Sequence, residues 1–550
     1  MNRALATIAA CVLLAACTKT SEVATTSGQA PGASGGPHNS YTIPHTLRIG
    51  DTQDITSLNP HLASAASLGN MSELTMAYLV RYDVNNHPVP ELATEVPTQA
   101  NGGVSKDGLT ITWHLRKGVK WSDGVPFDGD DLVWSTNAVN NQANNEIGRD
   151  GWDLITKIDE PDKFTVVYHL RKPYSAFLPT FFGSAGANPC ILPKHLLASL
   201  PNFNNADYNS KPVGIGPFRY VKWTRGDRVE LEPNPFYWRG TPKLQHITYR
   251  FIPDRNTLLT QMQTGELDLW PKAGAGYYDR LRALPNLTVV HFPGYYYSHV
   301  TFNVLHPAVS DPAVRLAIAY ATDRETLRAK VNHGTGTLSE SQLTPVSPMH
   351  TDRPLRAYDV AKANDILDKA GWVRGADGVR SKNGVRLALQ FVSYTGAADT
   401  DQLIELLRQS WAQIGVQFDV KRVNQALFFA PLAQGGPIFA GKFDVSSFSW
   451  GQTPDADYTS TLGCEDVPPK GENVARFCDP EIEKLLLQEK AAYDEPDRKP
   501  IIAKLDDRLA ETVPYFVLYI RDEIHAYNHD LQNFHPSSST PFDDFMNVDI

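Results

Sequence analysis

The sequence lacks the short motifs that mark several large classes of enzyme. It contains no H-E-x-x-H and no C-x-x-C, the patterns of zinc proteases and thiol redox centres. Gly274-Ala275-Gly276 and Gly334-Thr335-Gly336 are followed by neither the later glycine nor the lysine that a phosphate-binding loop needs. The 16 histidines are scattered without ligand spacing. We therefore expect no catalytic residue, no protein metal site and no cofactor.

Long hydrophobic runs are also missing beyond the N-terminus, where none approaches the 18 residues of a membrane-spanning helix. At the N-terminus, Arg3 precedes an apolar run from Ala4 to Ala16, which suits the core of a signal peptide. Leu14-Ala15-Ala16-Cys17 resembles a bacterial lipobox, in which Cys17 becomes lipidated. The alternative is an ordinary secretory peptide with a chance cysteine. We expect residues 1–16 to be removed and Cys17 to anchor the chain to a bacterial membrane.

Cysteine is scarce, with five in 550 residues. Cys464 and Cys478 enclose a loop of fourteen residues, and an oxidising compartment favours a disulfide between them. Such a bond would contribute about 3 kcal/mol on the chain-entropy estimate. Cys190 has no evident partner and is interpreted as a small buried hydrophobic residue.

Positive charge is in deficit, with 51 Lys and Arg against 61 Asp and Glu and a net charge of −10. This balance argues against non-specific binding of nucleic acid and permits cationic or neutral ligands. Hydrophobic residues make up 42% and charged residues 20%, as in soluble globular proteins. The length exceeds what one core supports, so two or three domains are expected.

Residues 17–45 are rich in Ser, Thr, Gly, Ala and Pro and are predicted to be a flexible tether, so regular secondary structure is expected to begin after them. Helical spacing predicts a helix over Ser72 to Tyr82. Thr322 to Glu325 reads as a capping box that starts another helix. Further on, strands and helices alternate, which indicates α/β layering. The further helices are predicted over Arg255 to Thr264, Asp359 to Ala370, Asp401 to Ile414, Pro480 to Tyr493 and Pro496 to Glu511. The strands are predicted over Leu109 to Leu115, Phe164 to Leu170, Ile247 to Ile252, Arg386 to Val392, Val416 to Val420, Asp444 to Ser449 and Tyr515 to Ile520.

Four blocks, in order, carry a family resemblance. The segment from Gly108 to Ser135 combines an alternating strand, a tight turn and a helix start capped by Asp128 to Asp131. The other blocks are Leu58-Asn59-Pro60-His61 with Tyr78 to Asp83 and Pro90 to Ala93, then Val213 to Phe218 with Asn234 to Trp238 and Thr264 to Leu269, and finally Asp311 to Arg324. Together they resemble the family 5 extracellular solute-binding proteins, the receptors of oligopeptide, dipeptide, nickel and some sugar importers.

The resemblance implies an α/β, two-lobed periplasmic-binding-protein-like fold (type II, cluster C), with an extra domain on the N-terminal lobe. Crossing strands would join the two lobes. Carried over by block, lobe one would comprise residues 46–85, 208–290 and 522–550. The extra domain would comprise residues 86–207, and lobe two residues 291–521. The Gly108–Ser135 segment would then be scaffold, with Trp121 and Trp134 packing.

The loop after Trp450 is the strongest candidate for solute contact. In peptide-binding relatives, an aspartate three residues after the matching tryptophan pairs with the free α-amino group of the ligand. Here that position is Thr453, and the nearest carboxylates are Asp455 and Asp457. Core packing is the alternative for Trp450, and loop capping the alternative for Asp455.

Other candidates come from three more places. Tyr295 and Tyr297 lie on one face and Tyr296 on the other if Gly294-Tyr295-Tyr296-Tyr297 is a strand. Trp270 matches a place where relatives line the pocket. Ser64 matches a place where the backbone of relatives contacts an extended ligand. The predicted solute contacts are Trp450, Asp455, Asp457, Tyr458, Tyr295, Tyr297, Trp270 and Ser64.

The resemblance implies a monomeric, lipid-anchored receptor in the periplasm or cell envelope that captures a solute, peptide-like in the first instance, and delivers it to an ABC permease. An oligosaccharide or a metal chelate is the alternative cargo. A secreted hydrolase acting on peptides or glycans, and a ligand-sensing lipoprotein without a transport partner, are alternatives of other classes. In a glycan hydrolase, the neighbouring pairs Asp130/Asp131 and Asp455/Asp457 would supply the catalytic carboxylic acids. Helix caps and solvated turns are the usual explanation for such pairs.

Overall fold

The computed structural model describes residues 38–76, 78–184, 189–396, 398–452, 454–542 and 544–550. A mixed sheet of ten strands runs through this part of the chain in the order β16-β15-β17-β11-β18-β10-β1-β9-β8-β7. From β16 to β7 its strands are β16 (Gln417–Val423), β15 (Ala388–Tyr394), β17 (Val445–Gly451), β11 (Leu287–Phe302), β18 (Tyr515–Asn528), β10 (Leu269–Trp270), β1 (Thr46–Asp51), β9 (His246–Phe251), β8 (Arg228–Pro233) and β7 (Phe218–Thr224).

Smaller sheets and the helices complete the architecture. The smaller sheets consist of β2 (Val80–Tyr82) with β3 (Pro88–Pro90), of β4 (Thr110–His114), β6 (Thr165–Leu170) and β5 (Ile155–Asp162), and of β12 (Val373–Arg374), β13 (Arg380–Lys382) and β14 (Val385–Arg386). The helices up to residue 330 are α1 (Ala66–Thr75), α2 (Gly129–Asn140), α3 (Phe177–Thr180), α4 (Lys194–Leu197), α5 (Arg255–Thr264), α6 (Tyr278–Arg282), α7 (Pro307–Ser310), α8 (Pro312–Tyr320) and α9 (Arg324–Lys330). Those that follow are α10 (Val360–Lys369), α11 (Ala398–Ala412), α12 (Gln425–Phe428), α13 (Thr459–Leu462), α14 (Pro480–Ala491) and α15 (Glu495–Thr512).

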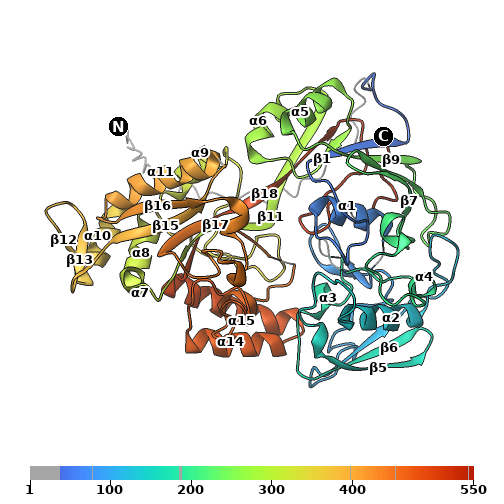
Figure 1. The fold of residues 1–550 in the computed structure, drawn as a ribbon, viewed down its shortest axis with the longest axis horizontal. Helices are drawn as coiled ribbons and strands as arrows, with labels where there is room; N and C mark the ends of the chain where they lie inside the picture. The colour runs from blue at the N-terminus through green and yellow to red at the C-terminus, as the bar shows by residue number, and fades with distance from the viewer. Residues whose placement is uncertain (1–37, 77, 185–188, 397, 453, 543) are drawn as a thin grey trace, which may run out of the picture. The chain divides into compact units, whose positions relative to one another are not determined.

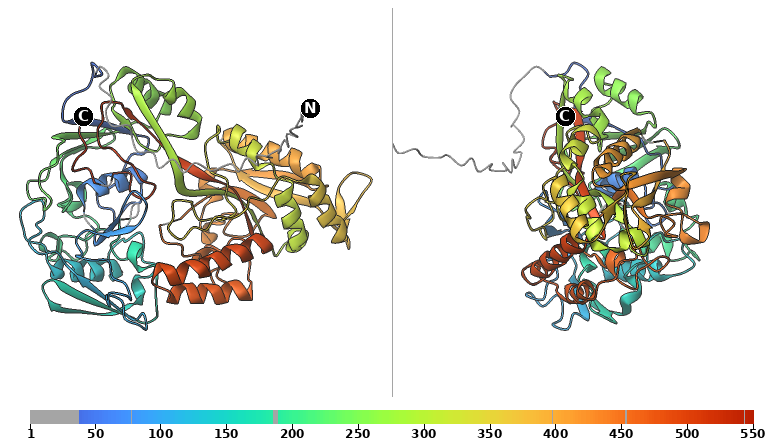
Figure 2. Two further views of the ribbon diagram at one scale, coloured as in Figure 1. Left: turned by 180° about the vertical axis from the view of Figure 1, so that it is seen from behind. Right: turned by 90° about the vertical axis from the view of Figure 1, so that its left-hand side faces the viewer.

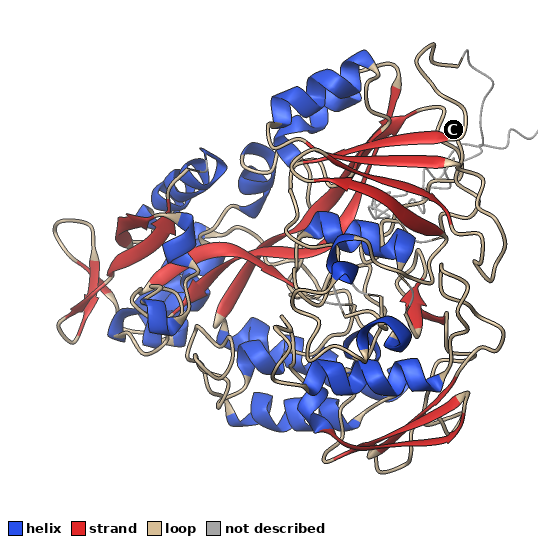
Figure 3. Ribbon diagram, turned by 45° about the vertical axis from the view of Figure 1, so that its right-hand side comes forward, coloured by secondary structure: helices blue, strands red, loops and turns tan. Residues whose placement is uncertain are grey.

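Two long antiparallel strands, β11 and β18, occupy the centre of the sheet. At one end they pair with β17, and at the other with β10, which continues to β1 and β9. Their register shifts between Pro293 and Tyr297, where the regular ladder is interrupted. Figures 1 and 2 show both strands continuing from the β15–β17 side of the sheet to the β1–β9 side. In Figure 3 they cross between two groups of helices and strands.

Three large groups of buried side chains flank the crossing strands, and smaller ones lie at residues 252–281 with 524–526 and at Tyr297, Val517 and Ile520. The N-terminal core is made by buried residues of 47–78, 190–251 and 527–548. The inserted core is made by buried residues of 79–215, which include Trp113, Trp121 and Trp152. The C-terminal core is made by buried residues of 300–519, in two adjoining clusters. The division into lobe one, extra domain and lobe two, with its boundaries, stays a prediction.

Most helix starts follow from capping side chains that are visible in the sequence. Asp128, Asp311 and Asp479 each accept a hydrogen bond from a backbone N–H of the first turn of α2, α8 and α14. At its other end, α5 stops at Gly265, which has φ +76° and therefore a conformation that glycine adopts without strain. These caps place the helices within a few residues of their predicted bounds.

Two local predictions are wrong. The helix expected over Ser72 to Tyr82 is instead α1, which ends at Thr75, because residues 80–82 pair with β3 as a strand. The capping box expected at Thr322 is shifted by one residue. Asp323 caps α9 by accepting from the Thr326 N–H at 3.0 Å, while the Thr322 hydroxyl donates to the Ile318 carbonyl of α8 at 2.8 Å.

The Gly108–Ser135 segment lies within the inserted core. Trp121 is buried, and its Nε1 donates to Asp131 Oδ2 at 3.1 Å, while the Asp131 side chain also completes the capping box of α2. Trp134 is partly buried against the N-terminal core. Cys190 is fully buried and unbonded. The segment therefore connects two cores as scaffold.

Residues at the start of the described chain are held by its C-terminal end. The Asn39 N–H and the Thr42 hydroxyl both donate to Asp530 Oδ2, at 2.8 and 2.5 Å. Residues 39–45, which the composition assigns to the tether, are thus ordered, whereas Cys17 and the signal peptide lie outside the described residues. The structure joins Cys464 to Cys478 in a disulfide. Within the described chain, no helix combines the length and the apolarity needed to cross a membrane.

Candidate functional site

A cavity of about 400 Å³ lies where the inserted core meets the C-terminal core. One wall belongs to the segments around β2, the loop before β4, and α3. The opposite wall belongs to the loop after β17 and to the turn that joins α14 to α15, which Figure 1 shows beside α3. The first wall consists of Tyr82, Asn86, Pro88, Val96, Pro97, Thr98, Ala100, Ser175, Phe177 and Leu178. The opposite wall consists of Pro348, Met349, Pro454, Asp455, Tyr493, Asp494, Glu495, Pro496 and Arg498.

The lining has the composition of a small-molecule site. Ten of the nineteen lining residues are apolar, five of them prolines, and the other nine are polar or charged. Apolar walls with a small number of placed polar groups are typical of pockets that bind organic ligands, and such pockets measure roughly 300–1,000 Å³. The charged groups on this lining are concentrated on the wall that carries Asp455 and Arg498.

Asp455 and Arg498 form a buried ion cluster with Glu489. Arg498 Nη1 donates to Asp455 Oδ2 at 2.7 Å, Nη2 pairs with the other carboxylate oxygen, and Nε donates to Glu489 Oε1 at 2.5 Å. Less than a tenth of each of these three side chains is exposed. Burial alone would lower the pKa of Arg498, but the two carboxylates outweigh it and raise this pKa. One guanidinium thus fixes the loop after β17 to α15 and α14.

Glu489 responds differently to the same surroundings. Burial raises the pKa of its carboxyl group to about 7, and the lowering by Arg498 only partly offsets this effect. Glu489 Oε2 is buried and has no hydrogen-bond partner among the described residues. The second carboxylate of the cluster is therefore poised to take up a proton near neutral pH.

Tyr82 adjoins the ion cluster, and Tyr295 lies near Tyr82. Tyr82 lines the cavity, and burial, Asp455 and Tyr295 all raise its pKa, in that order of importance. Tyr295 is only 7% exposed, and no described residue bonds its hydroxyl. Gln452, whose N–H donates to the Tyr295 carbonyl at 2.9 Å, also has a buried, unbonded Oε1. Buried polar atoms in proteins nearly always have a partner, so these two atoms are candidates to bond a solute.

Trp450 lies on β17 opposite Tyr297 of β11. Its ring packs against Phe448 and Phe439, with centroid distances of 5.2 and 6.5 Å. It also makes a side-chain hydrogen bond with Glu472, whose pKa burial raises. The tryptophan is only partly buried, and its contact with solute stays a prediction. Thr453 lies outside the described residues.

Of the predicted solute contacts, only Asp455 is on the wall of this cavity. Tyr458 and Tyr297 are buried, and their hydroxyls donate to Asp506 Oδ1 and Gln342 Oε1 at 3.0 and 2.9 Å. Trp270 is buried against Tyr277. Their polar or aromatic groups thus have protein partners, and a role in solute binding stays a prediction.

The other two candidates lie in loops. Asp457 Oδ1 accepts the Thr459 N–H at 2.7 Å, which is a local turn contact. Ser64 is exposed just before α1. Neither is on the cavity wall. The predicted alternation of the three tyrosines agrees with their burial, since Tyr296 is 51% exposed between the buried Tyr295 and Tyr297.

Sequence reasoning missed several residues on the cavity wall, including Arg498, Phe177 and Met349. They come from segments far apart in the chain, and nothing in their local sequence distinguishes them from core or helix-surface residues. Only Tyr82 lies in a block that carries the family resemblance. A buried arginine between two acidic segments leaves no periodic signal, because its partners are 43 and 9 residues away.

One group of acidic side chains in the described chain has metal-like spacing, formed by Asp128, Asp130 and Glu160. Lys163 and Lys194 both form ion pairs with Asp130, the latter at 3.1 Å. These pairs and the capping role of Asp128 account for the cluster as surface and cap chemistry.

The model of the bacterial extracellular solute-binding proteins, family 5 (middle region), matches residues 87–466. The chain belongs to this family. Oligopeptide-binding protein AppA of Bacillus subtilis (strain 168) is 24% identical over 500 residues, 89% of either chain. Glutathione-binding protein GsiB of Pectobacterium atrosepticum is 26% identical over 514 residues, 92% of this chain and 93% of that protein.

Solved structures show the same fold. The Bacillus subtilis AppA complex with a nonapeptide has a TM-score of 0.72 at 22% identity, over 92% of this chain and 98% of that one. NikZ of Campylobacter jejuni in complex with Ni(L-His) has a TM-score of 0.72 at 24% identity, with the same coverage. The two-lobed α/β binding-protein fold that the sequence resemblance implies is thus confirmed.

Proposed function

We propose that this protein captures a peptide-like solute in the cavity at Asp455 and delivers it to the permease of an ABC importer. The observation that carries the proposal is the cavity, which lies between the inserted and C-terminal cores. Apolar residues on its lining are combined with the buried ion cluster of Asp455, Arg498 and Glu489. The relatives named for oligopeptide and glutathione binding support the same class of cargo.

Two unbonded polar atoms that are not on the cavity wall are further candidates to bond a peptide-like solute. The Tyr295 hydroxyl can donate to an amide carbonyl, and Gln452 Oε1 can accept an amide N–H. Both atoms are buried without a partner among the described residues, so a solute that bonds them recovers a cost of roughly 1–3 kcal/mol for each. The apolar wall would receive side chains of the solute.

The same proposal covers the location of the protein. The apolar run ending in Leu14-Ala15-Ala16-Cys17 supports removal of a signal peptide and a lipid on Cys17. We place the mature chain outside the cytoplasm as a monomer, tethered to a bacterial membrane by this lipid alone. Mass spectrometry of the membrane-extracted protein would show a diacylglyceryl mass on its N-terminal cysteine, and an unmodified N-terminus at another residue would contradict the anchor.

Calorimetry on the full mature protein tests the cargo. Di- to nonapeptides, oligosaccharides and the Ni(L-His) complex are titrated separately, and micromolar or tighter binding of peptides alone is expected. Binding of a sugar or a chelate without any peptide would replace the cargo, and binding of none of them would overturn the receptor function.

A bulky substitution locates the site within the molecule. Ala100→Trp adds an indole to the cavity wall and should weaken peptide binding by about tenfold or more. Ala143→Trp is the matched control, because Ala143 is an exposed turn residue away from the cavity. Equal loss in both variants, or in neither, would place the solute elsewhere.

The last part of the proposal is that the protein binds its solute without cleaving it. Bound peptides should be recovered intact after prolonged incubation with the protein. Turnover of a peptide or glycan that Asp455→Asn abolishes would identify a hydrolase instead.

A further inference from the structure

The inserted core and the C-terminal core are in contact at the turn between α14 and α15, and the Asn86 Nδ2 also donates to the Val346 carbonyl at 3.2 Å. Tyr493, in this turn, places its hydroxyl between two backbone groups of the inserted core. The hydroxyl accepts the Tyr174 N–H at 2.6 Å and donates to the Gly108 carbonyl at 2.8 Å. Its ring packs into the inserted core, with its centroid 5.9 Å from that of Phe177.

Neighbouring residues add to this contact. The Ser175 N–H donates to the Lys490 carbonyl at 3.2 Å, and the Gln99 N–H donates to Asp494 Oδ1 at 3.2 Å. The Ser175 hydroxyl also reaches Glu489 Oε1 at 3.4 Å. We call this set, formed by Gln99, Gly108, Tyr174 and Ser175 with Glu489, Lys490, Tyr493 and Asp494, the Tyr493 contact.

Gly108 is shaped for this contact. Its φ is +69°, and a Cβ built on it would lie 2.5 Å from Tyr493 Cε2. A side chain at position 108 would therefore be strained by the backbone and would collide with the tyrosine ring. The glycine that begins the Gly108–Ser135 segment thus leaves the space that a residue of the C-terminal core fills.

The contact and the cavity share residues. Tyr493, Asp494 and Ser175 are all on the cavity wall, and so are Phe177 and Arg498 beside them. The two opposite walls of the cavity are therefore hydrogen-bonded to each other through the Tyr493 contact at one edge, and through Asn86 and the Val346 carbonyl at another place. Opening of the Tyr493 contact separates the walls along that edge.

We propose that Tyr493 is a positioning residue of the solute cavity, and that a bound solute leaves only after the Tyr493 contact has opened. The inference rests on the proposed solute site. Because the hydroxyl bonds two groups of the opposite wall, its removal shortens the lifetime of the contact and of the complex, while the groups that touch the solute stay in place.

Two measurements on the full mature protein test the proposal. Tyr493→Phe keeps the ring and removes both hydroxyl bonds. Hydrogen exchange of the peptides that contain Gln99 and Tyr174-Ser175 should accelerate by about tenfold. Stopped-flow release of a bound peptide should accelerate by a similar factor, while the association rate changes by less than about threefold.

Tyr168→Phe is the matched control. The Tyr168 hydroxyl is also buried in the inserted core, where it bonds Thr136 Oγ1 at 2.6 Å, but it does not reach the C-terminal core. This variant should lower thermal stability without changing exchange at Gln99 and Tyr174 or the release rate. Gly108→Ala disturbs the contact from the other side and should reproduce the Tyr493→Phe kinetics.

The outcomes separate the two proposals. Faster exchange with an unchanged release rate would overturn the positioning role and leave solute binding intact. Unchanged exchange in Tyr493→Phe would show that the hydroxyl does not hold the contact, which also overturns it. If the wild-type protein bound no solute at all, the proposed function would fail, and the exchange data would still report whether Tyr493 joins the cores.

Discussion

Asp455 links the solute cavity to the helices of the C-terminal core through a single arginine. The sequence offers two readings for this residue, solute contact and loop capping, and the structure gives it a third partner, Arg498. Both carboxylate oxygens face the guanidinium in a paired geometry that only arginine provides. The loop after β17 is thereby held against α15 whether or not a solute is present.

This pairing predicts how the protein treats the amino end of a peptide. Asp455 is engaged by Arg498 and Asp457 by the Thr459 N–H, so neither carboxylate is set aside for an α-amino group. Acetylating the N-terminus of a bound peptide should change its affinity by less than about threefold, whereas losing a buried charge pair costs about 2–5 kcal/mol. Calorimetry on matched free and acetylated peptides measures the difference. A loss of a hundredfold or more would show that a carboxylate of this chain does pair with the amino group.

At the scale of elements, capping side chains allowed most helices to be predicted. The Asp-Pro starts of α8 and α14 and the glycine end of α5 are local features, readable from neighbouring residues. The prediction failed over residues 72–82, because the pairing of β2 with β3 is set by tertiary context. The residues of the candidate site were harder to predict from the sequence, because they too are brought together only by tertiary structure. Arg498, Phe177 and Met349 meet only in the folded chain, and burial of an arginine between distant carboxylates has no local signature.

A buried histidine ties three loops of the N-terminal half together. His61 Nδ1 lies 2.6 Å from Glu146 Oε2, and Nε2 lies 2.8 Å from the Cys190 carbonyl oxygen, which can only accept. The side chains of His61 and Glu146 are completely buried. Burial alone would lower the pKa of His61, but Glu146 and the Cys190 carbonyl outweigh it and raise this pKa to about 10. The folded protein therefore holds the charged imidazolium over the whole physiological range.

The raised pKa makes this contribution to stability dependent on pH. The contribution is complete below the unfolded value of about 6.5 and is lost as the pH rises to about 10. His61→Gln should lower the free energy of unfolding by about 3–5 kcal/mol at pH 6, the range for breaking a buried pair. The deficit relative to the wild type should shrink as the pH approaches 10. Urea unfolding at a series of pH values measures it.

His38→Gln serves as the control for this series, because His38 is a largely exposed histidine that pairs with Asp530. Its removal should cost little at any pH, as is usual for exposed pairs. A His61→Gln deficit that stayed constant between pH 6 and 10 would contradict a charged His61 in the folded protein.

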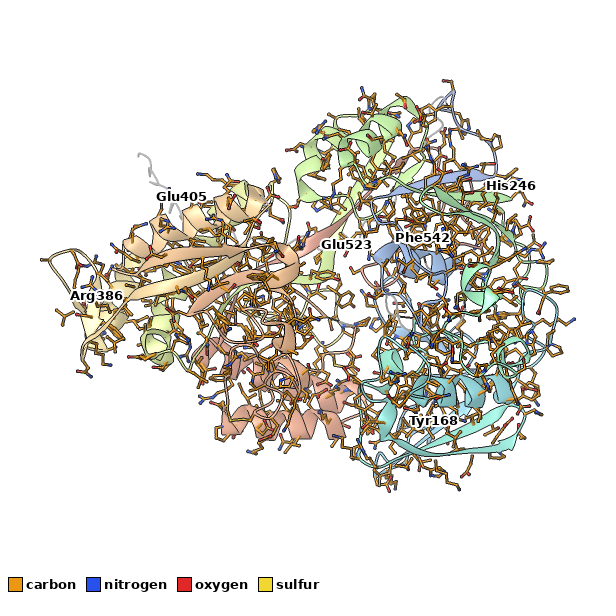
Figure 4. All side chains as sticks on the ribbon, viewed as in Figure 1. Tyr168, His246, Arg386, Glu405, Glu523 and Phe542 are labelled. Atoms are coloured by element: carbon orange, nitrogen blue, oxygen red, sulfur yellow. A yellow bond between two sulfur atoms is a disulfide. The ribbon has the colours of Figure 1, made fainter. Side chains whose placement is uncertain are left out.

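At the scale of the whole molecule, the described chain is unified by one sheet. β11 and β18 belong to the ladders of both the N-terminal and the C-terminal sides, and their register shifts between Pro293 and Tyr297 and again between Ser298 and His299. Figure 4 shows Glu523 on the stretch of β18 where the strand crosses. Cβ at Gly294 would approach the Glu523 side chain to 2.9 Å, so a larger residue here would crowd the crossing. The cavity and the Tyr493 contact lie instead between the C-terminal core and the inserted core, whose strands β4, β6 and β5 form a separate sheet.

Because the two walls of the cavity belong to different cores, a solute bound there should protect both at once. Amide exchange should slow in residues 96–100 and 175–178 of one wall and in residues 348–349 and 493–498 of the other. The β5–β6 hairpin of the inserted core, which is not on the wall, provides the internal reference and should exchange at the same rate with and without peptide. Because the peptide binds only the folded protein, a free peptide concentration of one hundred times Kd should stabilise the fold by about 2.7 kcal/mol. This added stability sets the upper size of the protection. Protection confined to one wall would mean that the solute binds a single core and that the cavity is not its site.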